Sequence, residues 1–221
     1  ADTGMDVLTH AVEAYTSTLA NDYTDGLALQ AIKLVFENLE SSVKNADFES
    51  REKMHNASTM AGMAFANAFL GMSHSMAHKI GGFFHTVHGR TNAILLPYVI
   101  RYNGTRPAKA ATWPKYNYYK ADVKFQDIAK MLGLPASTPE EAVDALAKAV
   151  YDLGVRVGID MSIKGQGVDE KEYMDTVEEI AYLAYEDQCS PANPRLPMVA
   201  DMVEILQDAY YGYKERPGRI K

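Results

Sequence analysis

Apolar side chains recur with the period of an α-helix along nearly the whole chain. Two segments show the spacing i, i+3, i+4, i+7 that places four side chains on one buried helix face. The first comprises Phe125, Ile128, Ala129 and Leu132, and the second comprises Val143, Leu146, Ala147 and Val150. The alternation typical of strands is almost absent, and residues 154–159 are the only short strand candidate. The pattern therefore predicts an all-α protein.

Helix-start signals accompany this periodicity. Before the second segment, Thr138 offers a capping hydroxyl, Pro139 takes the first helical position and Glu141 the third. Another helix opens with the acidic residues of 169–172. Its apolar face comprises Tyr173, Val177, Ile180, Ala181 and Ala184.

Two irregular stretches interrupt the helical pattern. Residues 103–120 contain a glycine, two prolines and four aromatic side chains, which predicts a packed surface loop rather than a partner-binding patch. Residues 163–168 form a connection marked by glycine. No internal repeat or low-complexity segment is present.

Charge and cysteine content narrow the class of protein. The formal net charge is -7, and such a surface repels nucleic-acid phosphates and anionic lipid. No apolar run approaches the roughly 18 residues needed to cross a bilayer, and the first residues lack the layout of a secretion signal. The single cysteine, Cys189, fits a reducing compartment. We expect a cytoplasmic protein with neither nucleic acid nor membrane as a partner.

The first candidate for chemistry is a pair near the start of the chain. Asp6 and His10 are four residues apart, so a helix stacks them on one face. Glu13 and Ser17 continue this polar stripe, and an apolar stripe runs beside it. The apolar stripe comprises Met5, Leu8, Val12, Tyr15 and Leu19. Taken alone, the polar stripe is interpreted as a solvated face.

Residues 65–89 change that interpretation, because they hold four of the six histidines. His74 and His78 are four apart on a helix expected to end near Gly81 and Gly82, and His85 and His88 follow in the turn beyond. Histidines this dense in an apolar, small-residue segment predict a shared role, since burying them separately is costly. The alternative is a set of hydrogen-bonded core histidines with one on the surface.

A carboxylate combined with imidazoles suits Fe(II), Zn(II), Co(II) or Mn(II). An open coordination position would permit Lewis-acid catalysis, but spacing alone does not say which clustered histidines bind. Glu52 and His55 have the Glu-x-x-His spacing of di-iron bundles, which need the motif twice, and it occurs once. The sequence contains neither His-Glu-x-x-His nor a His-Asp dipeptide, which disfavours zincin proteases and helical metal phosphohydrolases.

Three segments carry a family resemblance. GMDVLTHAVEAY at 4–15, the histidine-rich segment 61–103 and DQCSPANPR at 187–195 resemble the iron-containing (group III) alcohol dehydrogenases. The similarity runs over essentially the whole chain to the closing AYYGY, and is greatest to C-terminal modules of bifunctional aldehyde–alcohol dehydrogenases. It implies the all-α, multi-helix C-terminal domain of the dehydroquinate synthase-like, iron-type alcohol dehydrogenase fold.

The resemblance also implies a metal-ligand set. An Asp and three His bind the metal in that family, and the matching positions are Asp6, His10, His74 and His88. The implied metal is Fe(2+), with Zn(2+) as a possible substitute. The implied reaction is the NAD-dependent interconversion of acetaldehyde and ethanol in fermentation.

Three further residues acquire roles from the resemblance. His78 matches a histidine near the nicotinamide and substrate that is implicated in proton relay. Phe65 matches an aromatic residue beside the substrate pocket, and Cys189 lies in a loop that closes near it. The alternative for Cys189 is a small buried hydrophobic side chain.

The sequence departs from the family in one respect. No G-x-G-x-x-G opens a helix after a strand, so nothing here cradles a pyrophosphate. We therefore expect residues 1–221 to be a helical metal-binding domain, a fragment without the upstream NAD-binding half and inactive alone. Arg90 stands where an apolar residue is expected.

Partners and alternative functions complete the predictions. The expected partners are the upstream NAD-binding half, a small alcohol or aldehyde substrate and further copies in a homo-oligomer or filament. The alternative functions are a helical metal-dependent hydrolase and a filament-assembly module, the latter because related proteins form helical filaments.

Overall fold

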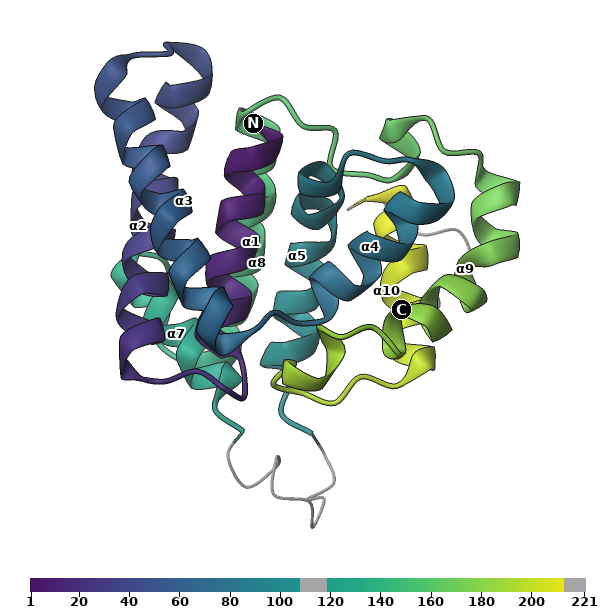
Figure 1. Cartoon of the computed structure of the whole chain (residues 1–221). Coiled ribbons are helices and arrows are strands. Elements are labelled where there is room, and N and C mark those ends of the chain that lie inside the picture. Colours follow the sequence, from purple (N-terminus) through teal and green to yellow (C-terminus); the bar gives the residue numbers. More distant parts are fainter. Residues whose placement is uncertain (108–118, 213–221) are drawn as a thin grey trace.

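The computed structural model describes residues 1–107 and 119–212, and every regular element in these ranges is helical (Figure 1). The α-helices are α1 (Asp2–Thr16), α2 (Asp22–Lys44), α3 (Phe48–Ala68), α4 (Met72–Phe84), α5 (His88–Gly104), α7 (Ala121–Met131), α8 (Pro139–Arg156), α9 (Glu170–Tyr185) and α10 (Val199–Tyr211). Short 3-10 turns lie at Lys164–Gln166 and Ser190–Ala192. The all-α prediction is confirmed. The strand candidate 154–159 is wrong, because its first residues complete α8 and the rest form a turn.

The predicted helix starts are confirmed by their caps. The Thr138 hydroxyl accepts a hydrogen bond from the backbone N–H of Glu141 at 3.2 Å, with Pro139 opening α8. Asp169 accepts one from the backbone N–H of Glu172 at 3.0 Å. These bonds satisfy N–H groups that have no partner inside a helix.

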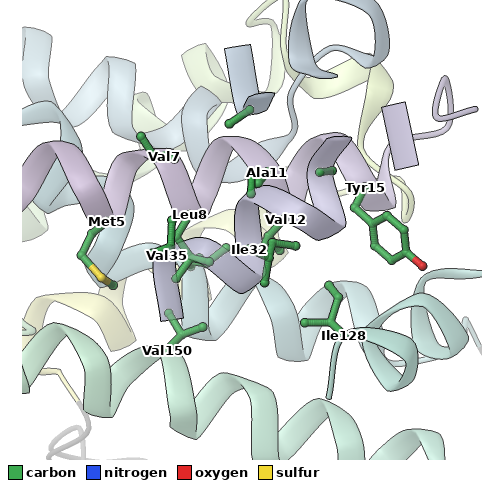
Figure 2. Close-up of a cluster of buried hydrophobic side chains, with 14 of the residues drawn as sticks. Met5, Val7, Leu8, Ala11, Val12, Tyr15, Ile32, Val35, Ile128 and Val150 are labelled. Carbon is green, nitrogen blue, oxygen red and sulfur yellow. The ribbon is translucent and has the colours of Figure 1, made fainter. Parts of the chain in front are cut away.

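The first of two hydrophobic cores surrounds α1, which packs against α2, α3, α5 and α7. Figure 2 shows side chains of this core, and Met5, Leu8, Val12 and Tyr15 of α1 are all buried in it. Leu19 does not continue the face, since α1 ends at Thr16 and Leu19 is 52% exposed. Burial on this side leaves the opposite face of α1 available for polar side chains.

The second core lies among α4, α5, α9 and α10, and α5 separates it from the first (Figure 1). Helix α5 serves both cores because apolar side chains cover opposite sides of it. Leu96 and Ile100 belong to the first core, whereas Leu95 and Val99 belong to the second. Both α1 and α4 pack against α5.

The connection from α4 to α5 differs from the prediction. Helix α4 continues through Gly81 and Gly82 and ends at Phe84. His85 caps it in the left-handed conformation, with φ 53°, and His88 is the first residue of α5 rather than part of a turn. Packing of α4 against α5 and α9 outweighs the cost of about 1 kcal/mol per helical glycine.

The two irregular stretches have different outcomes. Residues 163–168 form the predicted connection, and Gly167 adopts φ 83° within it. In the stretch 103–120, residues 103 and 104 complete α5, while 108–118 lie outside the described residues, so the packing of that loop stays a prediction. None of the described helices is both long and apolar enough to span a membrane.

Candidate metal centre

Three helices bring donor atoms together where α1 faces the first turns of α4 and α5. Asp6 comes from α1, His74 from the first turn of α4, and His88 from the first position of α5. One carboxylate oxygen of Asp6 lies 3.7 Å from His74 Nε2 and 3.7 Å from His88 Nε2. One donor atom from each residue lies within 4.8 Å of the other two. Donors sharing a tetrahedral ion at about 2.1 Å lie roughly 3.4 Å apart, so the spacing is near that of a metal site.

His10 lies beside this group, outside the set of donor atoms that lie within 4.8 Å of one another. Its ring lies between the rings of Phe65 and His74, with centroid distances of 4.6 Å and 4.5 Å. His10 Nδ1 is 3.9 Å from a carboxylate oxygen of Asp6. All four residues that the resemblance implies as ligands therefore lie side by side.

The remaining histidines lie elsewhere. His85 is exposed at the end of α4, and His55 is exposed on α3. His78 lies one turn beyond His74 and belongs to a different group of polar side chains. The structure thus groups His74 and His88 with Asp6 and leaves His78 and His85 outside that group, a distinction that spacing alone could not make.

A buried unsatisfied nitrogen indicates that the group fits a cation. His74 is 1% exposed, and its Nε2 has no hydrogen-bond partner among the residues that the structure describes. Leaving a buried polar atom unpaired is costly, and such atoms are rare. A divalent cation shared with Asp6 and His88 would satisfy this nitrogen, and the oxygen–imidazole donor set suits Fe(II) and Zn(II).

Charges in the cluster favour cation binding at neutral pH. Burial raises the pKa of Asp6, but His74, His10 and a hydrogen bond from Asn92 outweigh it and lower that pKa to about 2. Burial and the neighbouring charge of His74 lower the pKa of His10 to about 4. Burial likewise lowers the pKa of His88. At neutral pH, therefore, a carboxylate and two uncharged imidazoles are ready to bind.

His74 differs from the other two imidazoles. Burial lowers its pKa, but the carboxylates of Glu13 and Asp6 outweigh burial and raise it to about 9. Without a metal, this ring is protonated on both nitrogens and positively charged at neutral pH. Metal binding must displace that proton from Nε2.

The polar stripe that begins on α1 is buried at Glu13 and Ser17 and half-buried at Asp6 and His10, rather than solvated, which corrects the interpretation made from the pair alone. Glu13 is 3% exposed and Ser17 is 7% exposed. Glu13 Oε2 lies 2.6 Å from His74 Nδ1. Sequence reasoning missed Glu13, although its place on the stripe of Asp6 and His10 was the available signal.

Asn92 is a second polar residue that sequence reasoning missed. It is fully buried, and its amide nitrogen donates to Asp6 at 2.9 Å and lies 3.1 Å from His88 Nε2. The Ser73 hydroxyl lies 3.4 Å from the amide oxygen of Asn92. The only signal in the sequence was its position four residues after His88.

The first turns of α1 and α5 are in close contact beside the cluster, and this explains Arg90. Its guanidinium donates two hydrogen bonds of 3.0 Å to the carboxylate of Asp2. An apolar side chain at position 90 could not form this ion pair. Gly89 lies next to this ion pair. A Cβ at Gly89 would overlap the carbonyl oxygen of Asp2 and lie 3.1 Å from the Cβ of Asp6.

Replacing Gly89 by Ala is expected to weaken metal binding by at least tenfold and lower the free energy of unfolding by about 1–3 kcal/mol. The added methyl group must push the start of α5 away from α1, which moves His88 from Asp6. Co(II) titration and denaturant unfolding measure the two effects. Gly82→Ala is the matched control, because no atom lies within 4 Å of a Cβ at that position. Unchanged metal affinity in Gly89→Ala would contradict the expected displacement.

His78 borders the cluster and is held by an acidic partner. Its ring stacks on His88 at a centroid distance of 5.4 Å and an angle of 14°. Its Nδ1 lies 3.3 Å from a carboxylate oxygen of Asp187, which also pairs with Lys79 at 2.7 Å. The other Asp187 oxygen accepts from the backbone N–H of Cys189 at 3.0 Å. Burial raises the pKa of Asp187, but these contacts outweigh it and lower the pKa, so Asp187 is ionised.

The two residues expected at a substrate pocket differ in their exposure. Phe65, with Asp6 and His10, lines an open cavity of about 850 Å³ between α1, α2 and α3. Cys189 is 7% exposed and is not among the residues that line it. Burial and the charge of Asp187 raise the pKa of the Cys189 thiol to about 12. The role of Phe65 at the pocket stays a prediction, and Cys189 has the burial expected of a small hydrophobic side chain.

The Cys189 thiol is expected to react with iodoacetamide at pH 8 at least a hundredfold more slowly in the folded protein than in urea. A raised pKa keeps the thiol protonated, and only the thiolate is nucleophilic. As the pH rises, the reaction rate should continue to increase beyond pH 10, where the rate for an exposed thiol is already level. Mass spectrometry of the alkylated protein measures the rate. A plateau near pH 9 would contradict the buried, protonated thiol.

Comparison with known proteins agrees with the geometry. Residues 1–210 match the model of the C-terminal region of the Fe-containing alcohol dehydrogenase family. The chain is 80% identical over all 221 residues to an aldehyde-alcohol dehydrogenase of Streptococcus pneumoniae serotype 2 (strain D39), covering 25% of that protein. It is 43% identical over 214 residues to the bifunctional aldehyde-alcohol dehydrogenase AdhE of Escherichia coli K12, covering 95% of this chain and 24% of AdhE.

Solved structures share the fold. A 1,3-propanediol oxidoreductase has a TM-score of 0.83 at 37% identity, with 95% of this chain and 51% of that one covered. An iron-containing alcohol dehydrogenase of Thermococcus thioreducens has a TM-score of 0.81 at 36% identity, with 96% and 50% covered. The chain thus spans about a quarter of the length of the aldehyde-alcohol dehydrogenases and about half of these solved chains. By its sequence and its fold, the chain belongs to the iron-containing alcohol dehydrogenase family.

Proposed function

We propose that residues 1–221 form the metal-binding, catalytic domain of an NAD-dependent alcohol dehydrogenase that interconverts acetaldehyde and ethanol. The observation that carries this proposal is that Asp6, His74 and His88 meet at a buried His74 nitrogen with no hydrogen-bond partner among the described residues, with the His10 ring stacked beside it. The names of the aldehyde-alcohol dehydrogenases that the chain resembles support the substrate class.

The same four residues would hold the metal, with Fe(2+) as the native ion and Zn(2+) as a substitute. When bound, the cation supplies Lewis-acid stabilisation of the negative charge that develops on the substrate oxygen. The usual order of affinities favours Zn(II) over Fe(II), so supply rather than binding strength decides which ion is held.

His78 is proposed to carry the proton. Asp187 is ionised and can only accept, so it holds the Nδ1 hydrogen of His78 and leaves Nε2 free to exchange a proton with the alcohol. The side chain of His78 is 35% exposed, which allows that proton to reach solvent. Phe65 lines the cavity beside His10 and would contact the alkyl group of a small alcohol.

Partners outside these residues are also part of the proposal. The aldehyde-alcohol dehydrogenases are about four times as long as this chain, and we propose that an upstream half supplies the NAD site. That half would hold the nicotinamide against the substrate, since the cofactor performs the hydride chemistry. Assembly into homo-oligomers or filaments and a cytoplasmic location stay predictions from the resemblance.

The testing experiment uses the longer protein that contains this chain, purified without oxygen. Elemental analysis is expected to find about one iron or zinc per chain, and ethanol-dependent NAD reduction is expected to be lost on chelation. His78→Ala should lower turnover by about 10²–10⁴-fold while the metal is retained. His55→Ala is the control for metal retention, because its side chain is exposed and is not among the donors that lie together. Loss of the metal in His78→Ala would make His78 a ligand instead, and activity without any metal would refute the proposed site.

A further inference from the structure

The carboxylate of Glu13 connects α1 with the first turn of α4. Its Oε1 accepts a hydrogen bond from the backbone N–H of Ser73 at 2.7 Å. Its Oε2 accepts one from the backbone N–H of Gly71 at 3.1 Å and lies 2.6 Å from His74 Nδ1. Glu13 is 3% exposed, so these three contacts replace water almost completely.

The backbone contacts determine where the hydrogen atoms lie. Backbone N–H groups donate to both oxygens of Glu13, and hydrogen bonds of this kind favour the ionised carboxylate. The hydrogen in the short contact with His74 therefore belongs to Nδ1. The lone pair that the ring can present is then on Nε2, the nitrogen that lies 3.7 Å from Asp6 and has no hydrogen-bond partner in the described part of the chain.

The N-terminus of α4 is built to admit this carboxylate. Gly71 precedes the helix and supplies no side-chain cap, so Glu13 takes two of its free N–H groups. The Asn193 side chain takes a third, from Met72, at 3.2 Å. A Cβ at Gly71 would lie 2.8 Å from Asn193 Oδ1, closer than real side chains pack, and 3.0 Å from Glu13 Oε1, which is tighter than most contacts of a Cβ. Glycine at this position is what lets the two side chains reach the helix.

We propose that Glu13 is a positioning residue for the metal, because it holds the His74 ring with Nδ1 protonated and Nε2 directed at Asp6 and His88. The inference rests on the metal site of the proposed function. Carboxylates that orient a metal-binding histidine commonly contribute 10–100-fold to metal affinity. Glu13 would do so without touching the metal or the substrate.

An amide cannot replace this carboxylate. A glutamine side chain in its place would have one acceptor oxygen for three donors, so its NH₂ group must face a backbone N–H or His74 Nδ1. Facing Nδ1, it would favour the tautomer with hydrogen on Nε2, which has no lone pair on that nitrogen for a metal. Glu13→Gln in the longer protein is therefore expected to weaken Co(II) binding 10–100-fold and to alter the visible absorption bands of bound Co(II).

Asn193→Ala is the matched control. It removes the hydrogen bond to the Met72 N–H at the same end of α4, together with those to Asn103 and Arg195, but does not touch His74. It should therefore lower the melting temperature while Co(II) affinity stays within threefold. If Asn193→Ala weakens Co(II) binding as much as Glu13→Gln does, helix capping explains the effect and the inference is overturned.

His74→Ala separates the inference from the proposed site. If His74→Ala loses Co(II) but Glu13→Gln binds it within threefold of the original protein, the positioning role fails and the metal site stands. If His74→Ala retains Co(II), the site itself is wrong. Should Glu13→Gln not fold, Glu13→Asp carries the test: a loss of Co(II) affinity larger than that of Asn193→Ala supports the inference, and an equal or smaller loss overturns it.

Discussion

Replacing His74 by Ala is expected to weaken metal binding at least a thousandfold, enough to leave the purified protein without its ion. His74 supplies the most buried of the four proposed donors, at 1% exposed. Its removal also leaves the carboxylates of Asp6 and Glu13 without the imidazole between them. Glu13 would keep only its two backbone donors and Asp6 only the Asn92 amide, with no positive charge between them. Two neighbouring carboxylates in a largely buried site are costly, so the site should rearrange or take up water.

Equilibrium titration with Co(II) and elemental analysis measure this loss. His88→Ala should also weaken binding, but less, because His88 is 43% exposed and water can take its place. His55→Ala should retain the metal, since that side chain is exposed on α3 and lies outside the cluster. The ligand assignment fails if His55→Ala empties the protein of metal while His88→Ala remains fully loaded.

The 221-residue chain by itself is expected to show no NAD-dependent ethanol oxidation. Hydride transfer requires the nicotinamide at near van der Waals distance from the reacting carbon, and positioning of this kind can supply about 7–11 kcal/mol of the barrier. The sequence has no glycine-rich phosphate loop, and residues 1–107 and 119–212 form no strand that could belong to a dinucleotide-binding sheet. A bound metal alone would not bind NAD or orient its nicotinamide toward the substrate.

Three measurements on the isolated chain examine this prediction. We expect a helical circular-dichroism spectrum, measurable Co(II) binding and no detectable NADH formation from ethanol. The longer protein, or the upstream half added separately, should restore NADH formation. Robust ethanol oxidation by the isolated chain would mean that the cofactor site lies within these 221 residues.

Helices were predictable where the apolar period is long and regular. The faces assigned around Phe125, Val143 and Tyr173 became α7, α8 and α9, because a 3.6-residue period has one way to bury its apolar side. The errors lie where local signals are short. Residues 154–159 offer too few positions to distinguish a strand from a helix end. Gly81 and Gly82 suggest a stop, but contacts with α5 and α9 keep α4 helical.

The sequence by itself determined the secondary-structure class and the inventory of donors, because both follow from residue types and from spacing within one helix. It could place Asp6 over His10, four residues away. It could not relate either residue to His74 or His88, since distances between helices depend on how whole cores pack. Family resemblance had to supply that set.

Tertiary structure decided which side chains lie together and which are buried. Packing of α5 between two cores brings the first turns of α4 and α5 to the polar side of α1. That arrangement turns Glu13 from an apparently solvated residue into the partner of His74, and pairs Arg90 with Asp2, 88 positions away. Contacts between distant residues, and the burial of the polar side chains that make them, arise only when the chain is folded, and no local pattern in the sequence encodes them.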